Sequence, residues 1–136
     1  MHENKIALVI LADLATWQKL NVTAFLASSM AIAFPDIHGA ALVSASGTAY
    51  LPFMKQPVLV YAAETQEQLQ RAFNRAKERE LQIGIYTKEL FVTKNEEQNL
   101  IEIAKQNDDN LNLAGILIYG ESKKVDKAVE KLKLHP

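Results

Sequence analysis

The 136-residue sequence contains no cysteine, which excludes disulfides, thiolate nucleophiles and thiolate metal sites together. It also lacks an excess of either charge, because 15 Lys and Arg residues face 16 Asp and Glu residues. A general polyanion binder would need net positive charge or a basic patch. The remaining composition, 49% hydrophobic and 23% charged, is that of an ordinary globular protein and does not by itself indicate a function.

Long hydrophobic runs are missing as well. The first apolar run covers residues 6–12 and stops at Asp13, whereas a membrane-spanning helix needs about 20 apolar residues. The mixed charges of residues 1–5 differ from the basic start of a secretory signal. We therefore expect a cytoplasmic protein without a membrane contact.

Signatures of metal and nucleotide sites are also absent. The histidines His2, His38 and His135 have no partner at a recognised ligand spacing, so we expect no metal site. No glycine-rich loop follows the first apolar run, which argues against a Rossmann or P-loop site. No Gly-x-Ser-x-Gly elbow is present either. We expect no cofactor.

Short apolar runs alternate with helical patterns along the chain. This alternation predicts an α/β sandwich with a mainly parallel sheet, and no repeat or linker divides residues 1–136 into more than one domain. Strands are expected over residues 6–12, 41–44, 48–51, 58–62, 81–86 and 113–119, the second and third forming a hairpin or an irregular excursion. Helices are expected over residues 16–33, 65–79, 95–106 and 123–131, with Thr16, Thr65 and Ser122 as N-caps.

The helix expected over residues 16–33 has no charged side chain from Leu20 to its end. A helix without a charged face is buried on most of its circumference. We expect it to pack against the sheet and against a partner subunit.

Ligands of open α/β sheets collect beyond the carboxyl ends of the strands. The residues expected to line such a cleft are Asp13, Trp17, Lys19, Thr23, Tyr86 and Thr87. Lys19 and Trp17 could bind an anion and stack on a base, and Thr23 shares the helix face of Lys19 because it lies four residues later. In the alternative interpretation, Asp13 satisfies a helix N-terminus, Trp17 is a packing lid and Lys19 is solvated.

The last predicted helix is locally basic, since residues 123–133 contain five lysines and two acidic residues. One hypothesis for this segment is a contact with a nucleic acid, tRNA included. The alternative is an ordinary solvated helix, whose C-terminus favours cations in any case.

Several segments resemble the peptidyl-tRNA hydrolase type 2 superfamily. They are residues 5–14, Lys19 with the small-residue helix after it, residues 58–61, residues 113–120, residues 124–127 and residues 132–134. Residues 13–27, 56–58, 86–93 and the Leu-His-Pro end are more specifically similar to an uncharacterised bacterial branch, a domain of unknown function. The resemblance implies a three-layer α/β/α sandwich with a mixed four-stranded sheet, and a homodimer.

The hydrolase's functional motifs are largely replaced in this sequence. Its lysine- and glycine-rich loop is reduced to Lys19, its helical Gln and His correspond to Thr23 and Leu26, and its strand-end Asp corresponds to Thr87. Threonine cannot act as a general base near neutral pH, which leaves Glu89, two residues on, as a substitute.

Three functional hypotheses follow. The first is a module that binds a small anionic or nucleotide-like ligand in the cleft. The second is a hydrolase acting on peptidyl-tRNA or a related ester, with Lys19, Thr87 and Glu89 as candidate catalytic residues and Asp13 as an alternative base. The third is a structural homodimer that associates through its apolar first helix.

Overall fold

The structure is a computed structural model that describes residues 3–136. Its strands are β1 (Asn4–Leu11), β2 (Leu42–Val43), β3 (Ala49–Tyr50), β4 (Val58–Ala63), β5 (Gln82–Thr87), β6 (Leu113–Glu121) and β7 (Lys133–Leu134). Its helices are α1 (Thr16–Ala33), α2 (Gln66–Glu78), α3 (Glu96–Ala104) and α4 (Ser122–Ala128). Short 3₁₀ helices are η1 (Pro35–Ile37), η2 (Lys88–Phe91) and η3 (Asp108–Asn110).

The main sheet has five strands in the order β5-β6-β1-β4-β7. The β1–β4 pair is parallel, and the β1–β6, β5–β6 and β4–β7 pairs are antiparallel. The expected mixed α/β class is confirmed, but the mainly parallel, four-stranded sheet is wrong. β6 lies between β1 and β5 and runs antiparallel to both, so most strand pairs are antiparallel. β7 adds a fifth strand, two residues long, at the edge beside β4.

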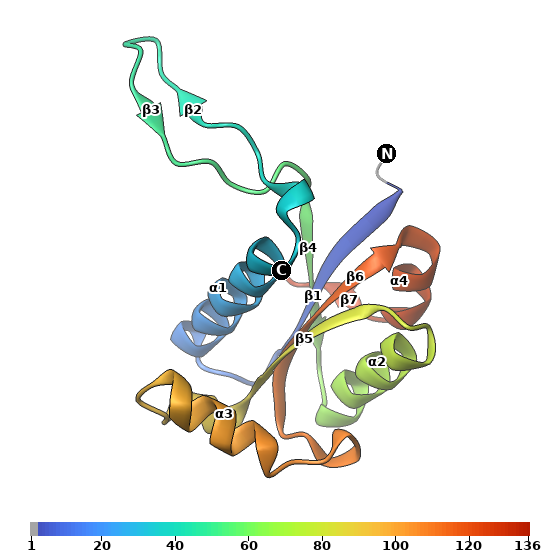
Figure 1. The fold of residues 1–136 in the computed structure, drawn as a ribbon. Coiled ribbons are helices and arrows are strands. Elements are labelled where there is room, and N and C mark those ends of the chain that lie inside the picture. The colour runs from blue at the N-terminus through green and yellow to red at the C-terminus, as the bar shows by residue number, and fades with distance from the viewer. Residues whose placement is uncertain (1–2) are drawn as a thin grey trace.

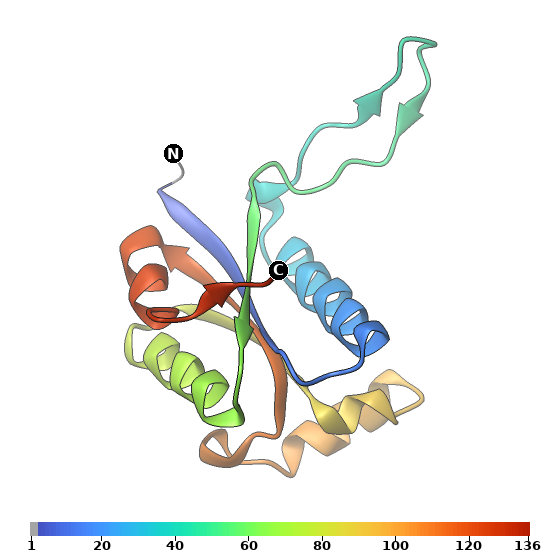
Figure 2. The same cartoon turned by 180° about the vertical axis from the view of Figure 1, so that it is seen from behind.

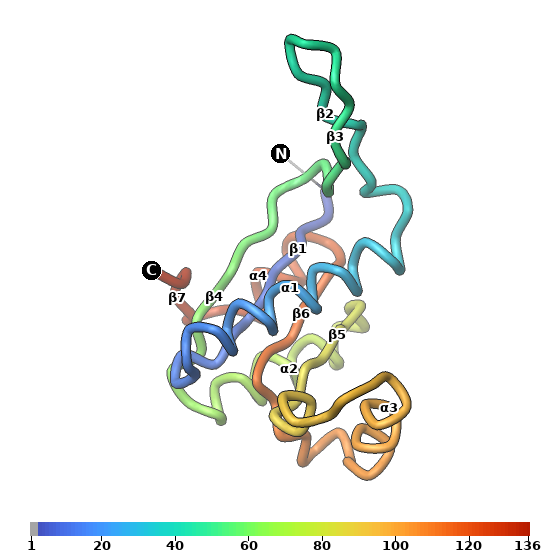
Figure 3. The backbone as a smooth tube through the Cα atoms, turned by 90° about the vertical axis from the view of Figure 1, so that its left-hand side faces the viewer, coloured from blue at the N-terminus to red at the C-terminus, as the bar shows by residue number. Residues whose placement is uncertain are grey.

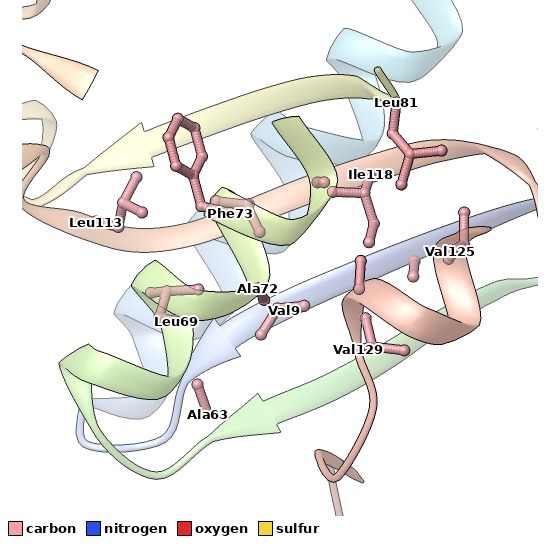
Figure 4. Close-up of a cluster of buried hydrophobic side chains, with 14 of the residues drawn as sticks. Val9, Ala63, Leu69, Ala72, Phe73, Leu81, Leu113, Ile118, Val125 and Val129 are labelled. Atoms are coloured by element: carbon pink, nitrogen blue, oxygen red, sulfur yellow. The ribbon is translucent and has the colours of Figure 1, made fainter. Parts of the chain in front are cut away.

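Helices cover both faces of this sheet (Figures 1 and 2). Along β1 successive side chains point to opposite faces, so Leu8 and Ile10 pack on the α1 side while Val9 and Leu11 pack on the α2 and α4 side. Figure 4 shows the second of these cores, in which Phe73 of α2 lies over the strands. Burial on both faces explains why β1 is a continuous apolar run.

The ends of two helices differ in how they are capped. Thr65 caps α2 as expected, its side chain accepting from the Gln68 N–H at 3.1 Å, and Gln68 accepts in return from the Glu64 N–H at 2.8 Å. In α1 the cap position is Ala15 rather than Thr16, and the Gln18 side chain accepts the Ala15 N–H at 3.0 Å.

The last predicted helix is shorter than expected and is followed by a strand. α4 begins at Ser122, one residue after its cap position, and ends at Ala128. Lys131 then adopts a left-handed conformation, with φ of 73°, and the chain turns back to pair β7 with the end of β4. Two residues are too few to give a strand pattern in the sequence.

α3 lies beyond the end of the sheet, not on either face (Figure 1). The helix follows from the apolar stripe Leu100, Ile103 and Ala104, which would also predict a buried face, but no residue of α3 is buried and Leu100 is 64% exposed. The periodicity therefore predicted the helix correctly and its burial wrongly.

Residues 39–54 form an arm that projects from the body beside the end of α1 (Figures 1 and 3). Its hairpin pairs Leu42 with Tyr50 and turns at Gly47, whose φ of 83° suits glycine. At its base the Gly39 N–H donates to the Phe53 carbonyl at 2.9 Å, and a Cβ at Gly39 would lie 2.4 Å from that oxygen. The predicted hairpin is confirmed.

Within residues 3–136, no helix combines the length and the apolar character that crossing a bilayer requires.

Candidate anion site and aromatic cluster

Lys19 and His135, which lie at opposite ends of the sequence, meet in the structure. The Lys19 Nζ atom lies 3.3 Å from the His135 Nε2 atom, and both side chains are half-buried. β7 carries His135 to this position, where its backbone N–H donates to the Val60 carbonyl at 2.8 Å. Lys19 is in the second turn of α1, which packs over the same face of the sheet as Val60.

The direction of this contact follows from the chemistry of lysine. A lysine ammonium can only donate hydrogen bonds, so in a hydrogen bond between the two side chains the His135 Nε2 atom is the acceptor. The other ring nitrogen, Nδ1, lies 3.0 Å from the Pro136 backbone oxygen.

No carboxylate among the described residues forms an ion pair with Lys19. The five ion pairs of residues 3–136 involve other cations, for example Lys5 with Asp126 and Lys77 with Asp108. A half-buried charge without a counter-ion has lost part of its hydration and gained no opposite charge in return. Such a group favours an anion from solution.

Thr23 lies one turn after Lys19 on the same side of α1. Its hydroxyl donates to the Lys19 carbonyl at 2.8 Å, so its proton is used within the helix. The oxygen remains able to accept a hydrogen bond.

Four aromatic side chains form a second cluster between α1, β5 and η2. The ring centroids of Trp17 and Phe91 are 5.7 Å apart, those of Phe91 and Tyr86 5.1 Å, and those of Tyr86 and Phe25 6.0 Å. Burial raises the pKa of the Tyr86 phenol. Trp17 remains 56% exposed, so one end of the cluster faces solvent. Phe25 and Phe91 were not among the expected site residues.

The structure divides the expected cleft residues into two groups. Trp17 and Lys19 are two positions apart on α1, which turns their side chains by about 200°. Trp17 therefore reaches Phe91 on η2, and Lys19 reaches His135 beyond β7. Asp13 is exposed in the bend that precedes α1.

Thr87 and Glu89 lie at the end of β5 and in η2. The Thr87 side chain is fully buried, and its hydroxyl oxygen has no hydrogen bond of ordinary geometry. Glu89 accepts hydrogen bonds from Asn112 Nδ2 at 3.0 Å and Gln106 Nε2 at 3.2 Å. Glu89 therefore fastens η2 to the segment between α3 and β6.

These contacts also set the charge state of Glu89. Desolvation by burial raises the pKa of the carboxyl group, but its polar neighbours outweigh burial and hold the pKa below the ordinary value. These neighbours are the Asn112 side chain, the backbone of Glu89 itself, and the Thr87 and Gln106 side chains. An ionised carboxylate with a lowered pKa is a poor proton acceptor.

Glu89 and the Lys19–His135 pair lie at opposite edges of the sheet. Glu89 follows β5 and His135 follows β7, the two edge strands. Four strand intervals, about 19 Å, separate these two edge strands, and no hydrogen bond or ion pair among residues 3–136 joins Glu89 to Lys19 or His135.

In the part of the chain from residue 3 onward, no group of three or more His, Asp or Glu residues is arranged to hold a metal ion. His38 is engaged with the Ala31 carbonyl through Nε2, and His2 lies outside the described residues.

Comparison with known proteins places the chain in a family. Residues 4–136 match the family described as "Protein of unknown function (DUF2000)". The chain belongs to this family. A solved structure, that of the protein of unknown function Atu0240 from Agrobacterium tumefaciens strain C58, is similar over 100% of both chains, with 34% identity and a TM-score of 0.96. No curated protein matches the chain.

The comparisons support one part of the expected resemblance, namely that the chain belongs to a family of unknown function. Neither the DUF2000 family nor the Atu0240 structure carries a link to peptidyl-tRNA hydrolase. His135 was the functional candidate that sequence reasoning missed, since no spacing in the sequence connects it with Lys19.

Proposed function

We propose that this DUF2000 protein binds a small anion, a phosphate or a carboxylate, at Lys19 beside His135. The observation that carries the proposal is the half-buried Lys19 ammonium, which contacts an imidazole and forms no ion pair with a carboxylate among residues 3–136. An anion at this position would supply the missing counter-charge and could accept hydrogen bonds from the remaining N–H groups of the Lys19 ammonium.

The geometry favours a small ligand over a nucleotide or a hydrolysed ester. Trp17, the exposed aromatic that could stack on a base, lies on the other side of α1 from Lys19. The hydrolase alternative requires Lys19 to act with Glu89, which lies near the opposite edge of the sheet and already accepts two amide hydrogen bonds. No contact in the described residues supports it.

The test is isothermal titration calorimetry of the purified protein with inorganic phosphate, pyrophosphate and succinate. We expect binding of at least one probe and a loss of roughly tenfold or more in Lys19→Met, since a charge-assisted hydrogen bond is worth about 1.5–3 kcal/mol.

The matched control is Lys133→Met, because Lys133 is exposed on β7 two residues before His135. It lowers the local positive charge equally and leaves the Lys19–His135 contact intact. The proposal is refuted if no probe binds or if both lysine variants weaken binding to the same extent. A melting temperature of Lys19→Met more than a few degrees below that of the wild type would mark Lys19 as structural.

A further inference from the structure

The arm and the outward side of α1 share one unusual property. From Leu20 to Met54 the sequence has a single charged side chain, Asp36. On α1 the outward side chains Leu20 and Ile32 are 66% and 81% exposed, and on the arm Leu51 and Phe53 are 87% and 70% exposed. One chain thus presents two uncharged apolar surfaces to solvent.

The chain does not cover these surfaces itself. Residues 40–53 of the arm are all exposed, and the arm leads away from the body rather than along its own helix (Figures 1 and 3). Its ladder consists of two residue pairs, and an isolated two-stranded hairpin is at best marginally stable in water. The arm therefore needs a surface to pack on.

The exposed area matches the requirement of a stable dimer. The four most exposed aromatic residues of the two surfaces, Trp17, Phe25, Tyr50 and Phe53, are 56–70% exposed. At about 200 Å² for each aromatic side chain, these four alone leave roughly 500 Å² uncovered. A standard interface buries about 800 Å² per partner, and the exposed aliphatic residues of both surfaces add to this area.

The dimensions of the two surfaces agree as well. The 18 residues of α1 span about 27 Å. One limb of the arm, residues 39–47, can extend to about 26 Å. An arm is therefore long enough to lie along a whole α1 helix. Neither surface carries a charge, so neither favours a charged partner over a second copy of the chain.

We infer that two copies of this chain associate by exchanging arms: the arm of each copy, residues 39–54, packs on the outward side of α1 of the other. The two contacts are equivalent by the two-fold symmetry that most homodimers adopt. This interface uses the side of α1 away from Lys19, so the anion site stays open and the inference stands independently of the proposed function.

The experiment compares exposed apolar positions replaced by aspartate. Val43→Asp alters the arm and Ile32→Asp alters α1. Leu100→Asp, at 64% exposure against 65% for Val43, is the matched control on α3 at the end of the molecule opposite the arm (Figure 1). None of these changes buries a charge within a chain, so each variant should fold, which far-UV circular dichroism checks.

Sedimentation equilibrium at about 10–50 µM protein gives the mass of the species in solution. We expect the wild type and Leu100→Asp at about twice the chain mass of 15.2 kDa, and Val43→Asp and Ile32→Asp near the chain mass. An equimolar mixture of Val43→Asp and Ile32→Asp should regain dimer, because the intact arm of one variant meets the intact α1 of the other. A monomeric wild type overturns the inference, as do two variants that stay dimeric or a mixture that stays monomeric.

Discussion

Replacing Gly115 by alanine tests how tightly α1 is seated on the sheet. Gly115 lies in β6 opposite Ile10 of β1. A Cβ atom there would come within 2.6 Å of Val22 Cγ1, 3.1 Å of Ile10 Cδ1 and 3.2 Å of the Val9 carbonyl oxygen. Real Cβ atoms essentially never approach other atoms to less than 3.0 Å, so either Val22 or the whole helix has to move.

The expected magnitude is the difference of two effects. Overpacking a well-packed core costs about 1–3 kcal/mol. Replacing a strand glycine by alanine recovers about 0.5–1 kcal/mol of backbone entropy. Because Val22 is fully buried and Ile10 and the Val9 carbonyl crowd the same methyl position, we expect Gly115→Ala to lower the free energy of unfolding by about 1–2 kcal/mol.

Guanidinium titration followed by circular dichroism measures this change, and Gly84→Ala is the matched control. Gly84 lies in the adjacent strand β5, and its Cβ would meet the Ser29 hydroxyl oxygen at 3.0 Å with no closer contact. We expect that change to be neutral within about 0.5 kcal/mol. Adding Val22→Ala to Gly115→Ala should cost less than the sum of the two single changes, because it vacates the space the new methyl group needs. Equal effects at the two glycines, or strict additivity, would refute the reasoning.

Three further changes follow from single contacts. Phe73→Ala removes the ring of a residue that is only 4% exposed in the α2 core and should cost about 3–5 kcal/mol in the same titration. Thr65→Ala removes the side-chain acceptor of the Gln68 N–H and should cost about 1 kcal/mol; no loss would show that the cap is dispensable. Glu89 has a lowered pKa in the folded state, so its stabilising contribution is present above the ordinary value of 4.5 and lost as the pH falls through the lowered one. Glu89→Gln should therefore reduce stability at pH 7 and flatten its decline below about pH 4.5; an unchanged acid profile would contradict this.

The elements of the fold could be predicted from local patterns, and their arrangement only in part. The apolar runs at β1 and β6 and the amphipathic stripe of α2 are strong periodic signals, and each element formed where its pattern lies. The direction of β6 could not be predicted, because an apolar run has the same pattern in a parallel and in an antiparallel strand. Tertiary contacts across the sheet set that direction. For α3 the pattern predicts the helix but not its surroundings, because Leu100 of its apolar stripe faces solvent at the end of the sheet.

The candidate site was predictable to the extent that it depends on α1. Helical spacing alone placed Thr23 on the side of Lys19. The same geometry also separates Trp17 from Lys19, although both follow the first apolar run closely in the sequence. His135 had no signal, because its approach depends on the turn at Lys131 and on a strand of two residues.

α1 therefore presents three surfaces that point in different directions. Val22, Leu26 and Met30 form the buried stripe that fixes the helix on the sheet. Lys19 points to one flank, where β7 supplies His135, and the uncharged outward side faces solvent. Because a shift of the helix at its buried stripe moves the other two surfaces with it, Gly115→Ala should also weaken anion binding while Leu100→Asp should not. A Gly115→Ala protein that binds the anion probes with wild-type affinity would show that the Lys19 flank is positioned by β7 rather than by the sheet beneath α1.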